Sequence, residues 1–426
     1  MKRNRLYNLQ NTKEINNYIY DISEQQVFNE LVNLEQLTFE LTDACNLKCK
    51  YCGYGDFYNT HDKRENKYLD FKTAKQVIDY LYDIWTKYPG TSNPRKIVFG
   101  FYGGEPLLNM KLIQQIIDYL NSLPTISHTV FNFNMTTNAI LLDRYMDFLA
   151  KNEFTLLLSL DGDEFGQSYR VDCQGKNSFH RVIQNIQKLK THYPDYFKNH
   201  ISFNSVLHDR NNTKSIQEFI NKEFGKVSQI SELSNFGICE SKKEEFNKMF
   251  HRTIDDISME DTDFVELFPD TMGVFRFVGK MSGNYFPSHY FLLKKSPNKL
   301  CPTGTCLPFG KKMFITVNGK ILPCERIDQK YALGYVTEKG VELDLAEVAR
   351  IYSNYYKKLK PICQECCLKP FCSQCMFYME NLDGKVKCPS FANEKHIRNY
   401  INYYSNIVRT HPELYKKVST ELLLQL

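Results

Sequence analysis

The amino-acid sequence predicts an α/β fold: a partial (β/α)6 TIM-like barrel followed by a cysteine-rich C-terminal domain. Two observations carry this prediction. Short β-like runs alternate with amphipathic helical patterns through the first 240 residues, and nine of the 14 cysteines lie between Cys301 and Cys388. Alternation of strand and helix favours a parallel sheet with right-handed crossovers. Six such units are too few for a closed eight-stranded barrel, so we expect an open one.

Runs rich in β-branched and aromatic residues are the expected strands of the barrel. They are Leu37 to Thr42, Lys96 to Tyr102, Val130 to Thr136, Phe154 to Leu160, His200 to Leu207 and Gln229 to Ile238. A helix is expected over 77–88, where apolar residues keep helical spacing until Pro89 and Gly90 break the pattern. Further helices are expected over 109–123, 140–152, 177–195 and 212–224.

The composition along the chain divides it into five expected segments. They are an N-terminal segment (1–34), the barrel (35–239), a bridge without recognisable chemistry (240–300), the cysteine-rich domain (301–390) and a C-terminal helical segment (391–426). Within the cysteine-rich domain, residues 314–322 have the pattern of a hairpin around an Asn-Gly turn.

Charge and hydropathy exclude several classes of protein. The 54 basic and 49 acidic residues give a net charge of +5 without a basic block, so we expect no nucleic-acid partner. No run approaches the ~18–20 apolar residues that span a bilayer, and no secretory signal is present. We therefore expect a cytoplasmic protein without a membrane partner. In that reducing compartment, cysteines are more often metal ligands or catalytic groups than disulfides.

Polar motifs follow each of the first four expected strands. They are Asp43-Ala44-Cys45, Gly103-Gly104-Glu105-Pro106, Thr136-Thr137-Asn138, and Ser159 with Asp161 and Gly162. Any one of them is compatible with a solvated turn. Because active groups of such barrels lie at the carboxyl ends of the strands, the four motifs together predict one site.

Three cysteines, Cys45, Cys49 and Cys52, lie in one short loop after the first strand. Structural zinc takes four protein ligands, and the next histidine, His61, lacks the usual zinc-finger spacing. A four-iron cluster held by three thiolates leaves one iron open to an exogenous ligand. The spacing Cys-x3-Cys-x-aromatic-Cys resembles the signature of the radical SAM superfamily. That resemblance implies that S-adenosylmethionine (SAM) chelates the open iron and is cleaved to methionine and a 5′-deoxyadenosyl radical.

The same resemblance implies roles for the other motifs. Gly103, Gly104, Glu105 and Pro106 look like the element that holds the methionine amino group, and Thr137, Asn138, Ser159 and Asp161 resemble segments that contact the methionine carboxylate or the ribose. Arg170 is expected to pair with the carboxylate, Tyr51 to pack near adenine, and Asn204 to make a polar contact. The residues alone also allow a plain turn at Gly-Gly-Glu-Pro, a surface ion pair between Asp161 and Arg170, and simple loop packing of Tyr51.

The nine C-terminal cysteines have regular spacing that resembles a SPASM domain. The resemblance implies two auxiliary 4Fe-4S clusters, the first held by Cys301, Cys306, Cys324 and Cys375 and the second by Cys363, Cys366, Cys372 and Cys388. Two residues separate Cys372 from Cys375 where the family usually has three. Cys367 is left over. A pair of zinc ribbons is the alternative that the spacing leaves open, and Cys173 and Cys239 are expected to be small buried hydrophobes.

The resemblance is closest to peptide maturases, which abstract hydrogen from a ribosomal precursor peptide and install a thioether or other crosslink. It implies a precursor peptide as substrate and a flavodoxin- or ferredoxin-type electron donor. One alternative is an anaerobic sulfatase-maturating enzyme, which forms formylglycine with an Asp base after the hairpin cysteine; here that position is Glu325. A non-catalytic zinc-ribbon protein is the alternative of another class.

Overall fold

The computed structural model describes residues 20–92, 94–252, 303–368 and 374–417, together with Val274, Phe277 and Cys372. The chain divides into two compact units. The barrel unit comprises Phe28–Asp270 and Phe309–Asp344, and the C-terminal unit comprises Met1–Val27, Thr271–Pro308 and Leu345–Leu426. The five expected segment boundaries remain predictions, and most of the expected bridge lies outside the described residues.

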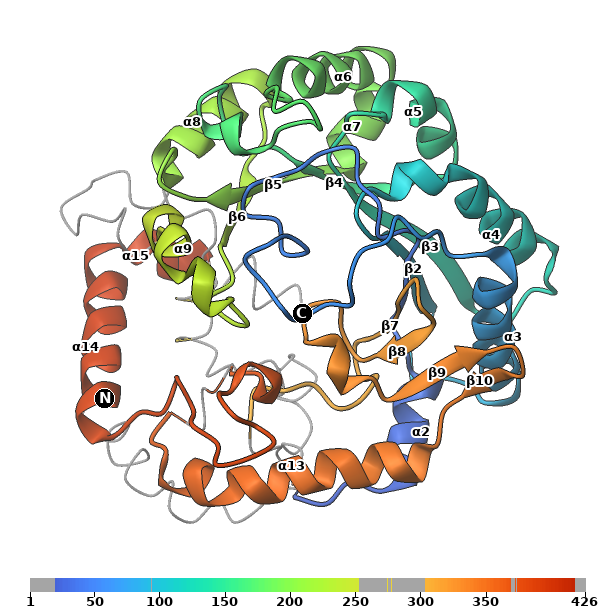
Figure 1. Cartoon of the computed structure of the whole chain (residues 1–426), viewed down its shortest axis with the longest axis vertical. Helices are drawn as coiled ribbons and strands as arrows, with labels where there is room; N and C mark the ends of the chain where they lie inside the picture. The colour runs from blue at the N-terminus through green and yellow to red at the C-terminus, as the bar shows by residue number, and fades with distance from the viewer. Residues whose placement is uncertain are drawn as a thin grey trace. The chain divides into compact units, whose positions relative to one another are not determined.

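The barrel unit is built on a ten-stranded sheet of order β10-β9-β8-β7-β1-β2-β3-β4-β5-β6. Its parallel part follows chain order and consists of β1 (Gln36–Glu40), β2 (Arg95–Tyr102), β3 (Thr129–Thr137), β4 (Thr155–Ser159), β5 (Ile201–Leu207) and β6 (Ser228–Glu232). Figure 1 shows the connecting helices along the outside of these strands. This arrangement confirms the predicted α/β fold and its partial barrel.

Some helices of the barrel were expected from the sequence and others were not. The expected helix over 77–88 begins earlier, at Phe71, and the helices over 24–32 and 243–249 were not predicted. The helices of the barrel unit are α2 (Glu24–Val32), α3 (Phe71–Lys87), α4 (Met110–Ser122), α5 (Leu142–Lys151), α6 (Phe179–His192), α7 (Pro194–His200), α8 (Thr213–Phe224) and α9 (Lys243–Met249), with 3-10 turns at Pro106–Asn109, Gly166–Tyr169, Glu240–Lys242 and Gln329–Tyr331. The helix expected over 177–195 ends earlier, at His192. Pro194 begins α7 instead, because proline lacks the N–H of a helix interior but suits a first turn.

The two faces of the parallel sheet differ in polarity. Phe99, Phe101 and Phe203 are completely buried, and the Phe99 ring contacts Trp85 of α3 with 6.4 Å between ring centroids. This apolar face therefore packs under the helices. The alternate positions carry small or polar residues such as Thr38 and Gly100. A Cβ on Gly100 would lie 2.6 Å from Thr38 Oγ1. The inner face of the barrel is thus polar, as successive side chains of a strand point to opposite faces.

Further strands extend the sheet beyond β1, and they pair with one another in antiparallel fashion. They are β7 (Lys312–Ile315), which pairs in parallel with β1, and β8 (Lys320–Leu322), β9 (Gly334–Thr337) and β10 (Gly340–Glu342). Phe314 pairs with Leu322, which confirms the hairpin predicted over 314–322. Gly319 has a φ of 76°, and a Cβ there would lie 2.7 Å from the Val336 carbonyl oxygen. The turn therefore requires glycine.

The C-terminal unit is mainly helical where it is described. It contains α13 (Leu345–Glu365), a 3-10 turn at Met376–Tyr378, α14 (Glu394–Thr410) and α15 (Pro412–Lys417). The last two helices confirm the expected helical end for the residues described there. Within the described ranges, no helix combines the length and the apolar character needed to cross a membrane.

Candidate cofactor site

The three-cysteine loop follows β1 and holds its thiols close together. Cys45, Cys49 and Cys52 are half-buried. Burial, together with the neighbouring thiols of the loop, raises the pKa of Cys45 to about 11 and that of Cys49 to about 12. The Leu47 amide donates to Cys45 Sγ at 3.4 Å. The sulfurs are therefore near enough to one another to bind one cationic group, such as the iron of a cluster, that displaces their protons.

The glycine pair after β2 packs directly on this loop. The Gly104 amide donates to the Thr42 carbonyl at 2.8 Å, and the Glu105 amide donates to the Ala44 carbonyl at 3.0 Å. A Cβ on Gly103 would lie 2.3 Å from Thr42 O, and one on Gly104 would lie 2.0 Å from Ala44 O. Only glycine permits this approach, so the Gly-Gly pair joins the end of β2 to the start of the cysteine loop.

Glu105 connects the ends of β2 and β3. Its completely buried carboxylate accepts hydrogen bonds from Thr137 Oγ1 at 2.7 Å, the Asn138 amide at 2.8 Å and the Leu107 amide at 3.1 Å. Burial raises the pKa of Glu105 to about 7, against the lowering effect of these bonds. Asn138 Nδ2 in turn donates to Asn46 Oδ1 at 2.7 Å and to Cys45 Sγ at 3.7 Å. The motifs after β2 and β3 therefore meet at the cysteine loop, as predicted for one site.

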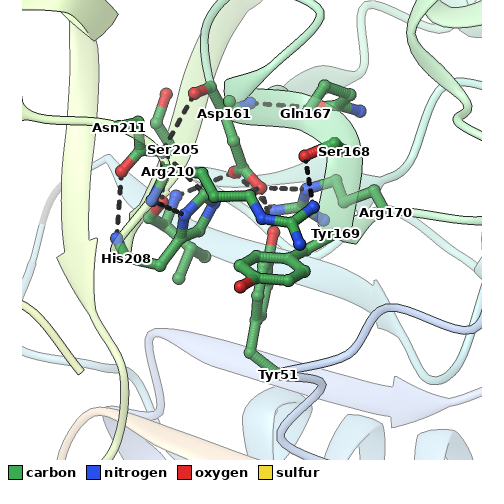
Figure 2. Close-up of polar contacts among 12 residues, drawn as sticks. Tyr51, Asp161, Gln167, Ser168, Tyr169, Arg170, Ser205, His208, Arg210 and Asn211 are labelled. Carbon is green, nitrogen blue, oxygen red and sulfur yellow. Dashed lines mark hydrogen bonds and ion pairs between the residues drawn. The ribbon is translucent and has the colours of Figure 1, made fainter. Parts of the chain in front are cut away.

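Asp161 and Arg170 form an ion pair that is buried, not exposed as a surface pair would be. Arg170 Nε lies 2.9 Å from Asp161 Oδ2, and a terminal nitrogen lies 3.0 Å from Oδ1, as Figure 2 shows. Their side chains are 8% and 0% exposed. Burial alone would raise the pKa of Asp161, but Arg170 and His208 lower it to about 2. Arg170 is thus held rigidly in a fork-to-fork geometry.

Tyr51 and His208 complete this network. The Tyr51 hydroxyl donates to Asp161 Oδ2, and His208 Nε2 lies 3.8 Å from the same oxygen. The rings of Tyr51 and His208 are 5.5 Å apart and both are buried. Because Tyr51 directly precedes Cys52, the network fixes the end of the cysteine loop to the strands β4 and β5.

The remaining polar positions lie on the neighbouring strands. Ser159 and Asn204 are paired across β4 and β5. Asn204 Oδ1 accepts a hydrogen bond from Ser231 Oγ at 2.8 Å. Pro106 begins the 3-10 turn after β2 and is buried. The structure therefore places the four sequence motifs at the carboxyl ends of β1 to β4.

A second polar cluster contains the expected base. Lys312 Nζ lies 2.9 Å and 3.2 Å from the two Glu325 oxygens, and Cys324 Sγ contacts Glu325 Oε2 at 3.5 Å. Burial would raise the pKa of Glu325, but the ion pair with Lys312 lowers it. Glu325 and Cys52 both act on Tyr54 and Tyr102, whose pKa values are raised chiefly by burial. Two tyrosines therefore stand near both the cysteine loop and Glu325.

The cysteines of the C-terminal unit gather in two neighbourhoods. Cys366 and Cys372 raise the pKa of Cys388, which burial places at about 11, so these three thiols are close. Cys306 likewise acts on Cys375, and Thr305 hydrogen-bonds to the Cys375 thiol. The Cys366 amide donates to the Cys363 carbonyl at 3.3 Å. These neighbourhoods agree with the grouping that the SPASM resemblance implies for those cysteines.

Two of the four cysteines expected to hold the first auxiliary cluster are not among the described residues of the C-terminal unit. Cys301 lies outside the described residues, and Cys324 belongs to the barrel unit. Within the described ranges, no three His, Cys, Asp or Glu side chains converge on a point that a single metal ion would occupy. A four-iron cluster binds each thiolate through a different iron, so its ligands stand farther apart than those of one zinc ion.

Sequence reasoning missed Tyr54, Arg64, Tyr102, His208 and Lys312, which face the predicted residues. Tyr102 immediately precedes the Gly-Gly pair, and Tyr54 lies two residues after Cys52. The positions of Tyr54 and Tyr102 next to these motifs were the sequence signal that could have identified them. Lys312 and His208 had none, because their contacts depend on strand pairing between distant segments. The rings of His61 and Tyr54 lie at a tilt, with 4.5 Å between their centroids, and His61 Nδ1 contacts Thr60 Oγ1 at 3.1 Å.

The residues present fit an iron-sulfur cluster that binds a small polar ligand. The donor set is three thiols with a glycine cradle beside them. Two buried polar atoms nearby, Asn46 Nδ2 and the Tyr54 hydroxyl, have no hydrogen-bond partner among the described residues. Buried polar groups are rarely left unpaired unless a ligand or water satisfies them.

Comparison with known proteins identifies this chemistry. Residues 39–222 match the family model described as the Radical SAM superfamily. A cysteine-type anaerobic sulfatase-maturating enzyme of Clostridium novyi is 23% identical over 393 residues, covering 86% of this chain and 96% of the relative. The radical SAM cyclopropyl synthase TigE of Paramaledivibacter caminithermalis is 25% identical over 334 residues, covering 75% of this chain and 63% of TigE.

The fold has a counterpart among solved structures. Native anSMEcpe with bound AdoMet aligns with a TM-score of 0.55 and 16% identity, over 91% of this chain and 100% of that chain. The family match over residues 39–222 and the enzyme relatives argue against the non-catalytic zinc-ribbon alternative. The chain is an enzyme that contains a radical SAM domain at residues 39–222 and a cysteine-rich C-terminal region that fits a SPASM domain.

Proposed function

We propose that this enzyme is a peptide maturase that installs an oxidative modification, such as a thioether or another crosslink, in a ribosomal precursor peptide. One observation carries the proposal: a buried, ion-paired carboxylate, Glu325, lies beside an auxiliary-type cysteine and shares two tyrosine neighbours with the SAM-type cysteine loop. Relatives named as a sulfatase-maturating enzyme and a cyclopropyl synthase support a protein or peptide substrate.

The proposed cofactors are SAM, one 4Fe-4S cluster on Cys45, Cys49 and Cys52, and two auxiliary 4Fe-4S clusters. Bound SAM would supply a 5′-deoxyadenosyl radical that removes a hydrogen atom from the substrate. Cys306 and Cys375, with Cys301 and Cys324, would hold one auxiliary cluster. The other would be held by Cys363, Cys366, Cys372 and Cys388, three of which lie together in the C-terminal unit. A flavodoxin- or ferredoxin-type donor and a cytoplasmic location complete the proposal.

The chain's own residues have separate tasks in this scheme. Gly103 and Gly104 let the backbone approach the methionine group, and Asp161 holds Arg170 in one orientation. Thr137, Asn138, Ser159 and Asn204 supply further polar groups at the same strand ends. Lys312 keeps Glu325 as a carboxylate, and that carboxylate would accept the proton that the substrate radical releases as the new bond forms. The electron released with this proton would pass to an auxiliary cluster.

The test is anaerobic incubation of the reconstituted enzyme with SAM, a reductant and a short peptide encoded beside its gene. Mass spectrometry of the product should show loss of a pair of hydrogen atoms, with fragmentation blocked between the joined residues. Glu325→Gln should keep SAM cleavage and lose most of the product. Full product formation by Glu325→Gln would remove Glu325 from the reaction.

Sulfatase maturation is the second candidate, favoured by the wide coverage of the Clostridium novyi relative. Glu in place of the usual Asp base moves the carboxylate by one methylene and argues mildly against it. A parallel incubation with a cysteine-containing sulfatase peptide separates the two activities. Formylglycine carries an aldehyde that a hydrazide reagent captures, whereas a thioether or carbon-carbon crosslink does not react.

A further inference from the structure

Two buried threonines lie against one thiol of the C-terminal unit. Thr303 and Thr305 are 0% and 3% exposed, and they lead directly into Cys306. Thr303 Oγ1 donates a hydrogen bond to Thr305 Oγ1 at 2.6 Å and accepts one from the Thr305 amide at 3.0 Å. The Cys375 thiol in turn accepts a hydrogen bond from the Thr305 hydroxyl. The two hydroxyls therefore form a short buried chain that ends on a cysteine sulfur.

The direction of the last hydrogen bond follows from the other contacts of Thr305. A threonine hydroxyl has one hydrogen to donate and two lone pairs that accept. Thr305 Oγ1 accepts the Met376 amide at 2.6 Å and the Thr303 hydroxyl at 2.6 Å. Because these two donors occupy both lone pairs, the hydroxyl hydrogen of Thr305 is directed to the Cys375 sulfur.

The sulfur of Cys375 also accepts hydrogen bonds from the backbone. The amides of Phe377 and Tyr378, in the 3-10 turn that follows, donate to it. Burial raises the pKa of Cys375, and the two amides and the Thr305 hydroxyl oppose that rise. A neutral thiol is a weak acceptor, whereas an anionic sulfur attracts donors strongly. The surroundings of Cys375 thus suit a thiolate, which is the form that binds iron.

The segment that carries the two threonines contacts both groups of cysteines in the C-terminal unit. Cys306 follows Thr305 directly and lies near Cys375, its expected partner in the first auxiliary cluster. The Gly304 amide donates to the sulfur of Cys372, which is expected in the second auxiliary cluster. The first contact uses a side chain and the second uses the backbone, so a substitution at Thr305 changes only one of them.

A hydrogen bond to a ligand sulfur changes the electron affinity of an iron-sulfur cluster. Reduction adds negative charge, part of which resides on the ligand sulfurs, so a donor stabilises the reduced state more than the oxidised state. Under the proposed function, the substrate radical gives one proton to Glu325 and one electron to an oxidised auxiliary cluster. A donor to a sulfur ligand of that cluster therefore favours the transfer of this electron.

We propose that Thr305 is a positioning residue that acts through Cys375, where its hydroxyl raises the reduction potential of the auxiliary cluster. Thr303 holds that hydroxyl in the donating orientation. The inference rests on the proposed function and deepens it, because it names a residue that adjusts the electron transfer. A purely structural role would end with Thr305 as the acceptor for the Met376 amide.

The test is an anaerobic redox titration of the reconstituted full-length protein, followed by electron paramagnetic resonance. Addition of SAM changes the signal of the cluster on the three-cysteine loop and so identifies it, which leaves the two auxiliary signals. The variants are Thr305→Val, which removes the hydroxyl, and Thr305→Ser, which keeps it. Thr303→Val is the matched control, since it disturbs the same buried network and leaves the Thr305 hydroxyl in place.

We expect Thr305→Val to make one auxiliary midpoint potential more negative and to leave the other unchanged. The ratio of reduced to oxidised cluster at a fixed potential should fall by about threefold to tenfold, and tenfold corresponds to about 59 mV for one electron. Thr305→Ser should restore most of the wild-type potential, and Thr303→Val should shift it less than Thr305→Val does. If Thr305→Val does not assemble its clusters, Thr305→Ala, which places no methyl group against the Met376 amide, carries the same comparison.

Three outcomes would overturn the inference. They are unchanged auxiliary potentials in Thr305→Val, an equal shift in Thr303→Val, and a Thr305→Ser potential equal to that of Thr305→Val. The last two would assign Thr305 to the packing of the segment. Failure of the proposed function is distinguishable, since wild-type protein would then show no reducible auxiliary cluster at all, and the inference would fall with it.

Discussion

At the scale of single residues, Asp161 is the most strongly constrained group of the site. Its carboxylate oxygens accept hydrogen bonds from Arg170, from the Tyr51 hydroxyl and from the Val206 amide, the last at 2.9 Å. The side chain is completely buried. A buried carboxylate is tolerated only when hydrogen-bond donors and opposite charges compensate its negative charge. Asp161 therefore joins the cysteine loop, β4 and β5 through one side chain.

Asp161→Asn should lower the free energy of unfolding by about 3–5 kcal/mol, since it leaves the buried Arg170 without its counter-charge. Because the folded pKa of Asp161 is depressed to about 2 from an ordinary value of 3.8, its stabilisation is present above pH 4 and is lost as the pH falls toward 2. Urea unfolding followed by circular dichroism measures the change. Asp56→Asn, at an exposed position, is the control, and an equal stability of the two variants would contradict the prediction.

At the scale of elements, the junction between β1 and the β7–β8 hairpin depends on Glu40. Its carboxylate is 3% exposed and accepts the Val317 amide of the hairpin turn at 2.9 Å. Burial raises the pKa of Glu40 to about 7, and the Val317 bond opposes that rise without cancelling it. The ionised side chain is thus disfavoured in the folded protein, although it links two elements that carry the site.

The sign of the pH dependence follows from that raised pKa. The folded protein binds the Glu40 proton more tightly than the unfolded chain, so the contribution of Glu40 to stability falls as the pH rises from about 4.5 through 7. Glu40→Gln should remove a decline on the order of 2 kcal/mol between pH 5 and pH 8. Urea unfolding at both pH values measures it. Exposed Glu218→Gln on α8 should keep the wild-type slope, and a wild-type slope in Glu40→Gln would refute the expectation.

At the scale of the whole molecule, the cysteines separate into groups with different expected functions. The loop cysteines belong to the barrel unit, whereas Cys366, Cys372 and Cys388 lie together in the C-terminal unit. Within each group the thiols lie close to one another. Removing a ligand from one group should therefore affect one cluster and spare the others.

Replacing Cys45, Cys49 and Cys52 together by Ala should remove about four of roughly twelve irons per chain and abolish 5′-deoxyadenosine formation. Cys366→Ala should also lose about four irons but should retain SAM cleavage while product formation falls. Iron and sulfide analysis with chromatographic detection of 5′-deoxyadenosine checks both. Cys173 is exposed and Cys239 only half-buried, so the expectation that both are buried hydrophobes is wrong. Cys173→Ala should match wild type. Loss of SAM cleavage in Cys366→Ala would show that the groups are not independent.

Much of the fold was predictable because strand and helix periods are local properties. The six expected strands overlap β1 to β6, and the Gly-Gly-Glu-Pro motif lies where a strand end should place it. The residues of the site were predictable only where they belong to a recognisable sequence motif. An ion pair between Asp161 and Arg170 was considered only as a surface alternative. Its burial was not predicted, because it results from packing of β4, β5 and the 3-10 turn around the two residues.

The sequence by itself determined the alternation that builds the barrel, the three-cysteine loop and the chemistry that such a loop supports, since residue type and spacing decide these. The tertiary structure alone decided that Lys312 meets Glu325, that His208 joins Asp161, and that Arg64 lies near Cys45. The partners in the first two contacts are 13 and 47 residues apart in the chain, and Arg64 comes to Cys45 only because its loop folds back on Asp43. Such contacts depend on how strands and loops pack, which no local pattern of residues specifies.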